Sequence, residues 1–331
     1  MTARPRRTAA APPAIDERRF HRWLVRALPN GARTPLPLGD DAAAVALPAR
    51  SVAVVSTDAL VEGTHFLRSS SPRSVGRAAS AVSLSDVAAK GAAPLAVFLA
   101  LVLPRGSPQA WAEQVVHAAE AEAARFGAHV LGGDTKPGPR RAVVSTVVGA
   151  APPARLVGRV GARPGDLLVT TGEVGRGGAV ARALRSRGPA RRRAVAGLLR
   201  VTPRVREGLV LARHAHAALD TSDGIAESAR LLAAASRVRL LVEEDRLPLL
   251  PSLRKIRSTR ARRAAAFYGG DYELLAAIPP GHLSAAEREV RAVGGRLTRV
   301  GVVERGRDAF LLTRDGRRPM PGAGWRPFGA R

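Results

Sequence analysis

Cysteine is absent from this 331-residue chain, and aromatic residues make up only 4% of it. The lack of cysteine excludes disulfide bonds and thiolate catalysis, and it fits a cytoplasmic protein. The hydrophobic share is nevertheless 46%, which is enough to build real cores. No apolar run reaches the roughly 18 residues that a membrane-spanning helix needs, so we expect no membrane partner.

Acidic residues and lysines are also scarce. Against 53 Lys and Arg stand 27 Asp and Glu, and the net charge is +26. A nucleic-acid-binding surface gathers basic residues on one face with aromatics among them. Here arginines are spread along the chain, with dense stretches at 182–193 and 254–263. We interpret them mainly as solvated surface residues and expect no nucleic-acid partner, while anionic substrates are attracted in either case.

The few acidic residues gather in short islands beside Gly, Ser and Thr, and eight of the 27 acids are the aspartates of these islands. Crowded carboxylates repel one another unless a cation lies between them, and Mg²⁺ takes oxygen ligands together with a phosphate. The islands therefore indicate metal-assisted phosphate chemistry. They are Gly39-Asp40-Asp41, Ser56-Thr57-Asp58, Leu84-Ser85-Asp86, Gly132-Gly133-Asp134-Thr135, Asp220-Thr221-Ser222-Asp223-Gly224 and Gly269-Gly270-Asp271-Tyr272-Glu273.

The order of apolar runs and turns predicts two α+β domains. We expect a flexible basic tail over 1–14, an N-terminal domain over 15–150 and a C-terminal domain over 151–331, divided at Ala151-Pro152-Pro153. Helical spacing predicts helices over 19–28, 72–90, 108–126, 179–187, 208–218 and 225–236. Short apolar runs predict strands over 42–47, 52–56, 95–103, 142–149, 166–171, 238–243, 272–278, 295–303 and 309–312, with a turn at 132–134.

Each island alone also fits an ordinary structural role. Ser56, Thr57 and Asp58 follow an apolar run, where such residues often cap a helix, and strand alternation prevents all three from facing one ion. Gly132 and Gly133 let a backbone approach a phosphate, or they form a tight turn. The glycine-rich segment 172–178 lacks the spacing of a dinucleotide-binding loop, and the chain has no Walker-type loop and no Gly-x-Ser-x-Gly elbow.

Taken together and in order, the islands are far more specific. With Val61-Glu62-Gly63-Thr64-His65-Phe66 after Asp58, they resemble the thiamine-monophosphate kinases, members of the aminoimidazole-ribonucleotide-synthetase-like superfamily of ATP-using enzymes. The resemblance covers residues 16–328. It implies an α+β fold whose N-terminal mixed sheet pairs across a homodimer and whose C-terminal α/β sandwich completes the active-site cleft. It also implies ATP and thiamine monophosphate as substrates, with several Mg²⁺ ions, giving thiamine diphosphate and ADP.

The resemblance further implies roles for single residues. ATP would lie on Gly133, Asp134, Arg159 and Ser222, and the thiamine phosphate would contact His65 and Trp325, whose indole suits a cationic ring. The family carries a substrate-contacting glutamate where this chain has Gly270, so either Asp271 takes over that contact or thiamine specificity is weakened. The implied magnesium shell comprises Asp41, Ser56, Thr57, Asp58, Asp86, Asp134, Asp220 and Asp223.

Direct transfer to a phosphate acceptor needs no general base, because a phosphate monoester has a second pKa near 6 and is already anionic. The obstacle is repulsion between two polyanions, about 4 kcal/mol per pair of unit charges at 4 Å and an effective dielectric near 20, which Mg²⁺ offsets. Two alternatives stay open: a related superfamily enzyme with another phosphate-bearing acceptor, and a basic nucleic-acid-binding protein on an inactive kinase fold. The cysteine-dependent selenophosphate synthetases are excluded.

Overall fold

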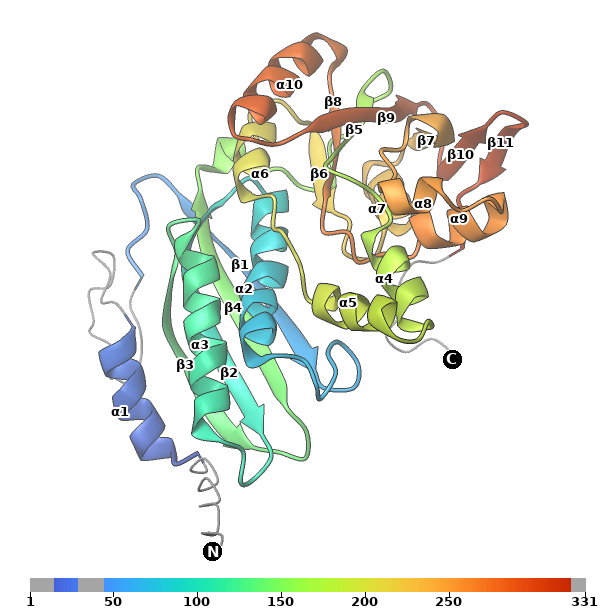
Figure 1. The fold of residues 1–331 in the computed structure, drawn as a ribbon. Coiled ribbons are helices and arrows are strands. Elements are labelled where there is room, and N and C mark those ends of the chain that lie inside the picture. Colours follow the sequence, from blue (N-terminus) through green and yellow to red (C-terminus); the bar gives the residue numbers. More distant parts are fainter. Residues whose placement is uncertain (1–14, 29–44, 323–331) are drawn as a thin grey trace, which may run out of the picture.

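Two separate β-sheets organise the molecule (Figure 1). The computed structural model describes residues 15–28 and 45–322. Within these residues the first sheet has four strands in the order β1-β4-β2-β3, and the second has seven in the order β11-β10-β7-β9-β5-β8-β6. Both sheets mix parallel and antiparallel pairs and carry helices, which confirms the predicted α+β class. No described helix is both long and apolar enough to cross a bilayer.

Long strands rich in Val and Ala form the first sheet. β1 pairs with β4 and β4 with β2 in antiparallel fashion, whereas β2 and β3 run parallel. The register sets Thr57 opposite Thr146 and Asp58 opposite Ser145. Because neighbouring residues of a strand face opposite sides, Thr57 and Asp58 lie on different faces of the sheet. The strands are β1 Val52–Val61, β2 Ala93–Leu103, β3 His129–Pro137 and β4 Ala142–Ala151.

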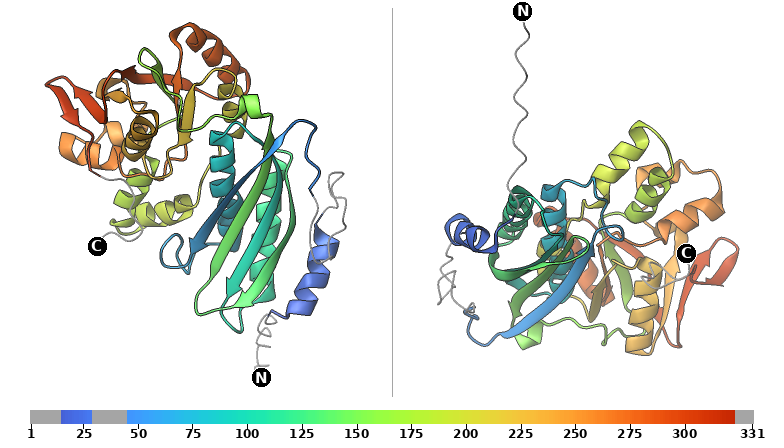
Figure 2. Two further views of the ribbon diagram at one scale, coloured as in Figure 1. Left: turned by 180° about the vertical axis from the view of Figure 1, so that it is seen from behind. Right: turned by 90° about the horizontal axis from the view of Figure 1, so that it is seen from below.

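Two long helices cover one face of this sheet, and Figure 2 (left) shows the opposite face open along β1 and β4. Helix α2 (Pro72–Ala89) begins where the Ser71 hydroxyl accepts a backbone N–H, and it ends before Gly91, whose φ is 68°. Helix α3 (Gln109–Ala124) packs along α2, and α1 (Glu17–Ala27) contacts α3. The described elements therefore cover one face of the sheet and leave the other face open.

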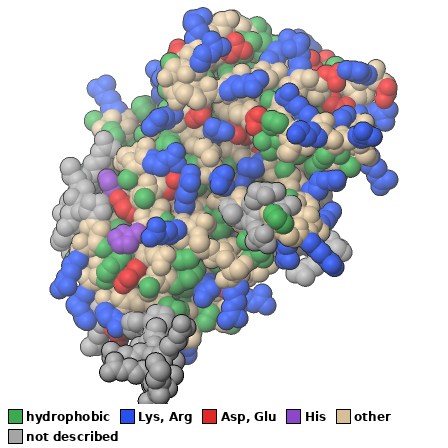
Figure 3. Space-filling model, viewed as in Figure 1, with side chains coloured by type: hydrophobic (Ala, Val, Ile, Leu, Met, Phe, Trp, Pro, Cys, Tyr) green, Lys and Arg blue, Asp and Glu red, His purple; other side chains and the backbone are tan. Residues whose placement is uncertain are grey.

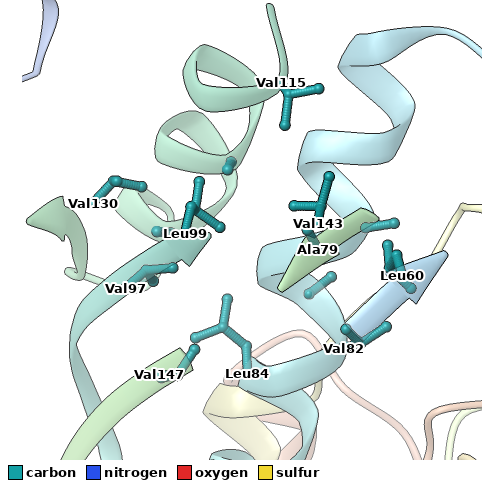
Figure 4. Close-up of a cluster of buried hydrophobic side chains, with 14 of the residues drawn as sticks. Leu60, Ala79, Val82, Leu84, Val97, Leu99, Val115, Val130, Val143 and Val147 are labelled. Atoms are coloured by element: carbon teal, nitrogen blue, oxygen red, sulfur yellow. The ribbon is translucent and has the colours of Figure 1, made fainter. Parts of the chain in front are cut away.

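The space between this sheet and its helices is a packed apolar core (Figure 4). Burying a Val or Leu side chain stabilises a fold by roughly 1.5–3 kcal/mol. Leu60 and Val82 belong to this core and also line the pocket described below, so core packing supports one wall of that pocket. Other labelled members are Ala79, Leu84, Val97, Leu99, Val115, Val130, Val143 and Val147.

Shorter strands build the second sheet, in which β7 and β10 are parallel and the remaining pairs are antiparallel. Leu168, Leu240 and Leu275 are fully buried within it. Its strands are β5 Leu167–Thr171, β6 Ala217–Asp220, β7 Arg239–Glu243, β8 Leu274–Ile278, β9 Leu297–Glu304, β10 Ala309–Thr313 and β11 Gly316–Pro319. The helices of this half are α4 Arg176–Leu184, α5 Pro189–Leu198, α6 Val205–Leu211, α7 Ile225–Ser236, α8 Pro251–Arg254, α9 Thr259–Ala266 and α10 Leu283–Ala292.

Several predicted elements differ from the observed ones. β3 continues through Gly132 and Gly133, where a turn was expected, after a register shift at Leu131 in its pairing with β2. A Cβ added at Gly133 would lie 1.8 Å from the Leu99 carbonyl oxygen, so glycine here lets β3 approach β2. The helix expected over 208–218 ends at Leu211, and its last residues begin β6. Residues 45–47 of the strand expected over 42–47 have no regular structure, and its first residues lie outside the described ranges.

Glycine also sets the contact between the two halves, at helix α6. A Cβ added at Gly208 would lie 2.1 Å from the Ala88 carbonyl oxygen of α2. The backbones of α6 and α2 therefore pack without an intervening side chain. Arg204, just before α6, donates from Nε to Oε2 of Glu273 at 2.7 Å and from a terminal nitrogen to Oε1 at 2.5 Å. Helix α6 is thus fixed to α2 on one side and to the second sheet on the other.

Candidate active site

A pocket of about 690 Å³ lies between the two halves of the molecule. From the first half it takes the end of β1, residues 63–67 and helix α2; from the second it takes α4, the end of β6 and residues 268–272. Its apolar wall includes Phe66, Leu184 and Leu198. The pocket thus has the cleft position that the sequence predicts for an active site.

Four of the predicted metal-binding aspartates line this pocket. Asp58 comes from β1, Asp86 from α2, Asp220 from the end of β6 and Asp223 from the turn that follows. They arrive from three separate elements far apart in the sequence. Strand register, helix packing and contact between the two halves are all needed to bring them together.

Serine hydroxyls hold two of these carboxylates in place. Ser56 Oγ donates to Asp86 Oδ2 at 2.5 Å. Ser85 and Ser222 donate to the two carboxylate oxygens of Asp220, at 2.8 and 2.9 Å. Both hydroxyls thus donate to a carboxylate. Ser56 positions Asp86 of the predicted metal shell, and Ser222 positions Asp220.

Negative charge in this pocket is poorly compensated. Burial raises the pKa of Asp58 from 3.8 to about 6, with a further contribution from the nearby Asp86 carboxylate. Burial also raises the pKa of Asp220 to about 6, again with Asp86 next, and it raises that of Asp223. These carboxylates would ionise more readily if a cation lay among them.

The residues fit Mg²⁺, although they do not form a ready-made cage. Among the described residues, no three His, Asp or Glu side chains converge closely enough to hold an ion by themselves. Mg²⁺ usually binds through one or two carboxylates and completes its shell with waters and substrate phosphates. Asp58, Asp86 and Asp220, with the raised pKa values of the first and last, suit that mode of binding.

Three predicted site residues lie away from this pocket. Thr57 is on the opposite face of the sheet from Asp58, where its hydroxyl is 2.9 Å from that of Thr146. Asp134 of β3 is opposite Ala100 of β2. It is exposed, and its carboxylate pairs with Lys136 at 2.7 Å. Gly133 is within the same strand rather than in a phosphate-binding loop. Within one chain, none of the three reaches the Asp58 carboxylate cluster.

Asp271 occupies a different place from the one predicted for a substrate contact. It is only 4% exposed, and its Oδ1 accepts backbone N–H groups of Gly175, Arg176 and Gly177 at 3.0, 2.6 and 3.4 Å. Burial raises its pKa to about 7, although these three hydrogen bonds act in the opposite direction. The carboxylate thus caps helix α4 and satisfies the backbone N–H groups at its start.

Two further predicted residues, Arg159 and His65, do line the pocket. Arg159 is exposed, and its charge opposes the raised pKa of Asp223. Nδ1 of His65 accepts the backbone N–H of Val61 at 3.1 Å, and burial lowers the pKa of its imidazole. A neutral imidazole therefore faces the substrate space. Asp41 and Trp325 lie outside the described residues.

Sequence reasoning missed two pocket residues, Arg176 and Tyr272. Arg176 belongs to the glycine-rich segment that was set aside because its spacing excludes a dinucleotide loop. Tyr272 lies inside the last island, and its backbone has φ of 57°, which is rare for a tyrosine. Burial, followed by the Asp220 carboxylate, raises the pKa of its phenol. A positive φ cannot be read from sequence, and no pattern in the last island indicated that Tyr272 lines the pocket.

Comparison with known proteins decides the family. Residues 39–151 match AIR synthase related protein, N-terminal domain, and residues 163–313 match AIR synthase related protein, C-terminal domain. A thiamine-monophosphate kinase of Halobacterium salinarum is 38% identical over 84% of this chain and 91% of its own length. The chain belongs to the thiamine-monophosphate kinase family. The resemblance drawn from the acidic islands is thereby confirmed.

Solved structures agree with this family membership. The thiamine-monophosphate kinase of Stenotrophomonas maltophilia superposes with a TM-score of 0.78 at 32% identity, covering 85% of this chain and 92% of that one. AaThiL complexed with AMPPCP and TMP superposes with a TM-score of 0.73 at 28% identity, covering 85% and 89%. The two-domain architecture of the thiamine-monophosphate kinase family is thus present along most of the chain.

Proposed function

We propose that this protein transfers a phosphoryl group from ATP to thiamine monophosphate, giving ADP and thiamine diphosphate. The observation that carries the proposal is the cleft lined by Asp58, Asp86 and Asp220, where burial and the Asp86 carboxylate raise the pKa of Asp58 and Asp220. Family membership and the relative complexed with AMPPCP and TMP support the choice of substrates. The division into residues 15–150 and 151–331, with the active site between them, is part of the same proposal.

In this mechanism the pocket residues bind and orient two anions. Asp58, Asp86, Asp220 and Asp223 would hold Mg²⁺, which on binding would neutralise phosphate charge and align donor with acceptor. Arg159 adds fixed positive charge beside Asp223 for ATP, and Ser222 holds Asp220 in position. His65 and the apolar wall would receive the acceptor. The acceptor phosphate is already anionic near neutral pH, so no side chain has to remove a proton.

The test is coupled measurement of ADP and thiamine diphosphate. Purified protein should form ADP only when Mg²⁺ and thiamine monophosphate are both present. Asp58→Ala should lower turnover by at least 100-fold, because a carboxylate that would neutralise phosphate charge through Mg²⁺ is lost. Asp245→Ala removes a carboxylate on the surface, paired with Arg314, and should leave turnover unchanged. ATP turnover that ignores thiamine monophosphate would contradict the assigned acceptor.

A homodimer belongs to this proposal. The open face of the first sheet carries Val55, which is 59% exposed, together with Val144 and Val148 of β4. Apolar side chains on an uncovered face of a sheet are typical of an interface. Thr57 and Asp134 lie on this same face. If either takes part in phosphoryl transfer, as the family resemblance implies, it must do so toward a second copy of the chain.

The high positive charge gives no separate function. Figure 3 shows Lys and Arg side chains spread over the face in view rather than gathered in one patch. Several arginines are paired with acids, among them Arg77 with Glu122 and Arg263 with Glu244. Nucleic-acid binding would show as a steep loss of DNA affinity with rising salt, in protein that does not turn over ATP.

A further inference from the structure

Arg176 places an unpaired positive charge in the wall of the pocket. Its terminal nitrogens donate to the carbonyl oxygens of Gly197 and Gly270, at 3.2 and 2.7 Å. Its Nε is buried and has no hydrogen-bond partner. No carboxylate within the described residues forms an ion pair with it; Asp271 acts on it electrostatically, but Asp271 Oδ1 accepts backbone N–H groups. Each terminal nitrogen carries a second N–H, so these donors, unlike the buried Nε, are available to a ligand.

The surroundings hold this guanidinium rigidly. Asp271 fixes the Arg176 backbone through the cap of α4, while Gly270 and Gly197 fix the side chain from two other segments. Burial lowers the pKa of Arg176, yet an arginine stays protonated at any physiological pH. A positioned, partly desolvated arginine is the side chain best suited to recognising a phosphate.

Tyr272 connects this charge to the carboxylate cluster. Its phenol interacts electrostatically with Asp58, Asp86, Asp220 and Arg176, and all five residues line the same pocket. An acceptor phosphate that lies beside Tyr272 would thus be within reach of Arg176 and next to the proposed metal site. The apolar wall formed by Leu184, Leu198 and Phe66 would receive the remainder of the molecule.

We propose that Arg176 is a specificity-determining residue that binds the phosphate of the acceptor. The inference rests on the proposed function and adds a residue to it. The two anions would bind to different groups. ATP would bind to the carboxylates through their cations, and the acceptor phosphate would bind to Arg176. Gly270 contributes to the same site, since its carbonyl oxygen accepts a hydrogen bond from Arg176 and its missing side chain adds no further carboxylate beside the guanidinium.

The first test compares wild type with Arg176→Met and Arg176→Lys, using thiamine monophosphate as acceptor and thiamine, which lacks the phosphate, as competitive inhibitor. Arg176→Met should raise the KM for thiamine monophosphate at least 10-fold and leave both the KM for ATP and the inhibition constant of thiamine within 2-fold. Arg176→Lys should restore part of the loss. Arg200→Met is the matched control, since Arg200 is a nearby exposed cation outside the pocket lining.

Equal weakening of the binding of thiamine and of thiamine monophosphate would show a structural role and overturn the proposal, as would a rise confined to the KM for ATP.

If Arg176→Met does not fold, a comparison of Gly270→Glu with Gly270→Gln tests the proposal instead. A Cβ at this position has room, 3.5 Å from Gly177 Cα, and both variants carry the same backbone strain at φ of 77°. Only the glutamate neutralises Arg176, so a larger KM for thiamine monophosphate in Gly270→Glu supports the proposal, and equal values overturn it.

Failure of the proposed function gives a different result. A wild-type protein that does not phosphorylate thiamine monophosphate contradicts that function alone. The affinities of thiamine monophosphate and thiamine, measured by calorimetry on wild type and Arg176→Met, still test the role of Arg176. A preference for the phosphorylated form that disappears in Arg176→Met supports that role, and a preference that persists overturns it.

Discussion

The hydroxyl of Ser85 donates to Asp220 Oδ2 at 2.8 Å, and this bond joins helix α2 of the first half to strand β6 of the second. The two residues are 135 positions apart in the chain. One acidic island thus positions another. The arrangement of carboxylates in the pocket depends on how closely the two halves are held together.

Ser85→Ala should weaken Mg²⁺ binding as well as stability. The variant leaves Asp220, which is mostly buried, with one hydrogen bond fewer, and we expect a loss of about 1–2 kcal/mol in the free energy of unfolding. The Mg²⁺ concentration needed for half-maximal turnover should rise several-fold, because Asp220 is no longer oriented. Urea unfolding and a Mg²⁺ titration measure the two effects.

Ser80→Ala is the matched control for that change. Ser80 is another buried serine of α2, but its hydroxyl donates to the Ala119 carbonyl oxygen within the first half. It should cost similar stability and leave the Mg²⁺ requirement unchanged. The same Mg²⁺ requirement in both variants would show that Ser85 has no special part in the site.

Stability should depend on pH through Asp58. Its pKa in the folded protein is about 6 against an ordinary 3.8, so its contribution to stability is complete below about pH 4 and is lost as the pH rises to about 6. Without Mg²⁺, Asp58→Asn should therefore match wild type near pH 4 and melt on the order of 3 °C higher above pH 6. Thermal melts of both proteins from pH 4 to pH 8 measure the difference.

Mg²⁺ should reverse that order above pH 6. Ions that bind ionised Asp58 stabilise the wild type and release protons, whereas Asp58→Asn gains less. The stability added by about 5 mM Mg²⁺, an ordinary assay concentration, should decrease as the pH falls below 6. A Mg²⁺ effect that is equal in both proteins at every pH would place the ion elsewhere.

Glu273→Ala should strongly destabilise the fold. Glu273 is buried and accepts both hydrogen bonds of the Arg204 fork and one from Thr171. Removing one partner of a buried pair costs about 3–5 kcal/mol, and Arg204 would keep Glu207, at 3.4 Å, as its one remaining carboxylate partner among the described residues. Glu289→Ala, at an exposed pair with Arg213, should change stability far less, because solvent screens the pair. Denaturant midpoints compare the two, and similar losses would refute a buried pair at Glu273.

Val55→Glu should convert the protein to a monomer. The charge falls on the open face of the first sheet, where we place the dimer interface. Sedimentation velocity should give a dimer for wild type and a monomer for the variant. Leu312→Glu provides the control, because Leu312 is exposed on β10, far from this sheet in the fold. Dimers that persist in Val55→Glu would move the interface elsewhere.

Sequence alone reaches the fold class and selects four aspartates that line the pocket, Asp58, Asp86, Asp220 and Asp223. Alternation along β1 also indicates that Thr57 and Asp58 cannot face one ion, and the two lie on opposite sides of the sheet. Only the family resemblance, and no local pattern, implied that Asp58, Asp86 and Asp220 share one site, because their meeting depends on contact between the two halves. The cap that Asp271 forms on α4 was equally hidden, since its partner N–H groups are about 95 positions away.

Boundaries failed where local preference gave way to tertiary contact. The pair Gly132-Gly133 is typical of a turn, yet the chain stays extended because β3 hydrogen-bonds along β2 beyond it. Residues 212–218 have helical spacing, but Ala217 and Ala218 complete the edge of the second sheet through pairing with β8. In both places hydrogen bonds to a distant strand outweigh the preference of the local sequence.

The absence of a β-carbon at Gly208 has a consequence for how substrates enter. Backbone against backbone leaves α6 and α2 no side chains that could exchange rotamers, so this junction cannot slide or hinge without breaking contact. Helix α4 is held in the same way on the other side of the pocket, since a Cβ added at Gly177 would lie 1.8 Å from the Gly269 carbonyl oxygen and one added at Gly178 would lie 2.0 Å from the Ala265 carbonyl oxygen. The pocket thus lies between two junctions of backbone against backbone, so substrates must enter a cleft whose walls keep their spacing.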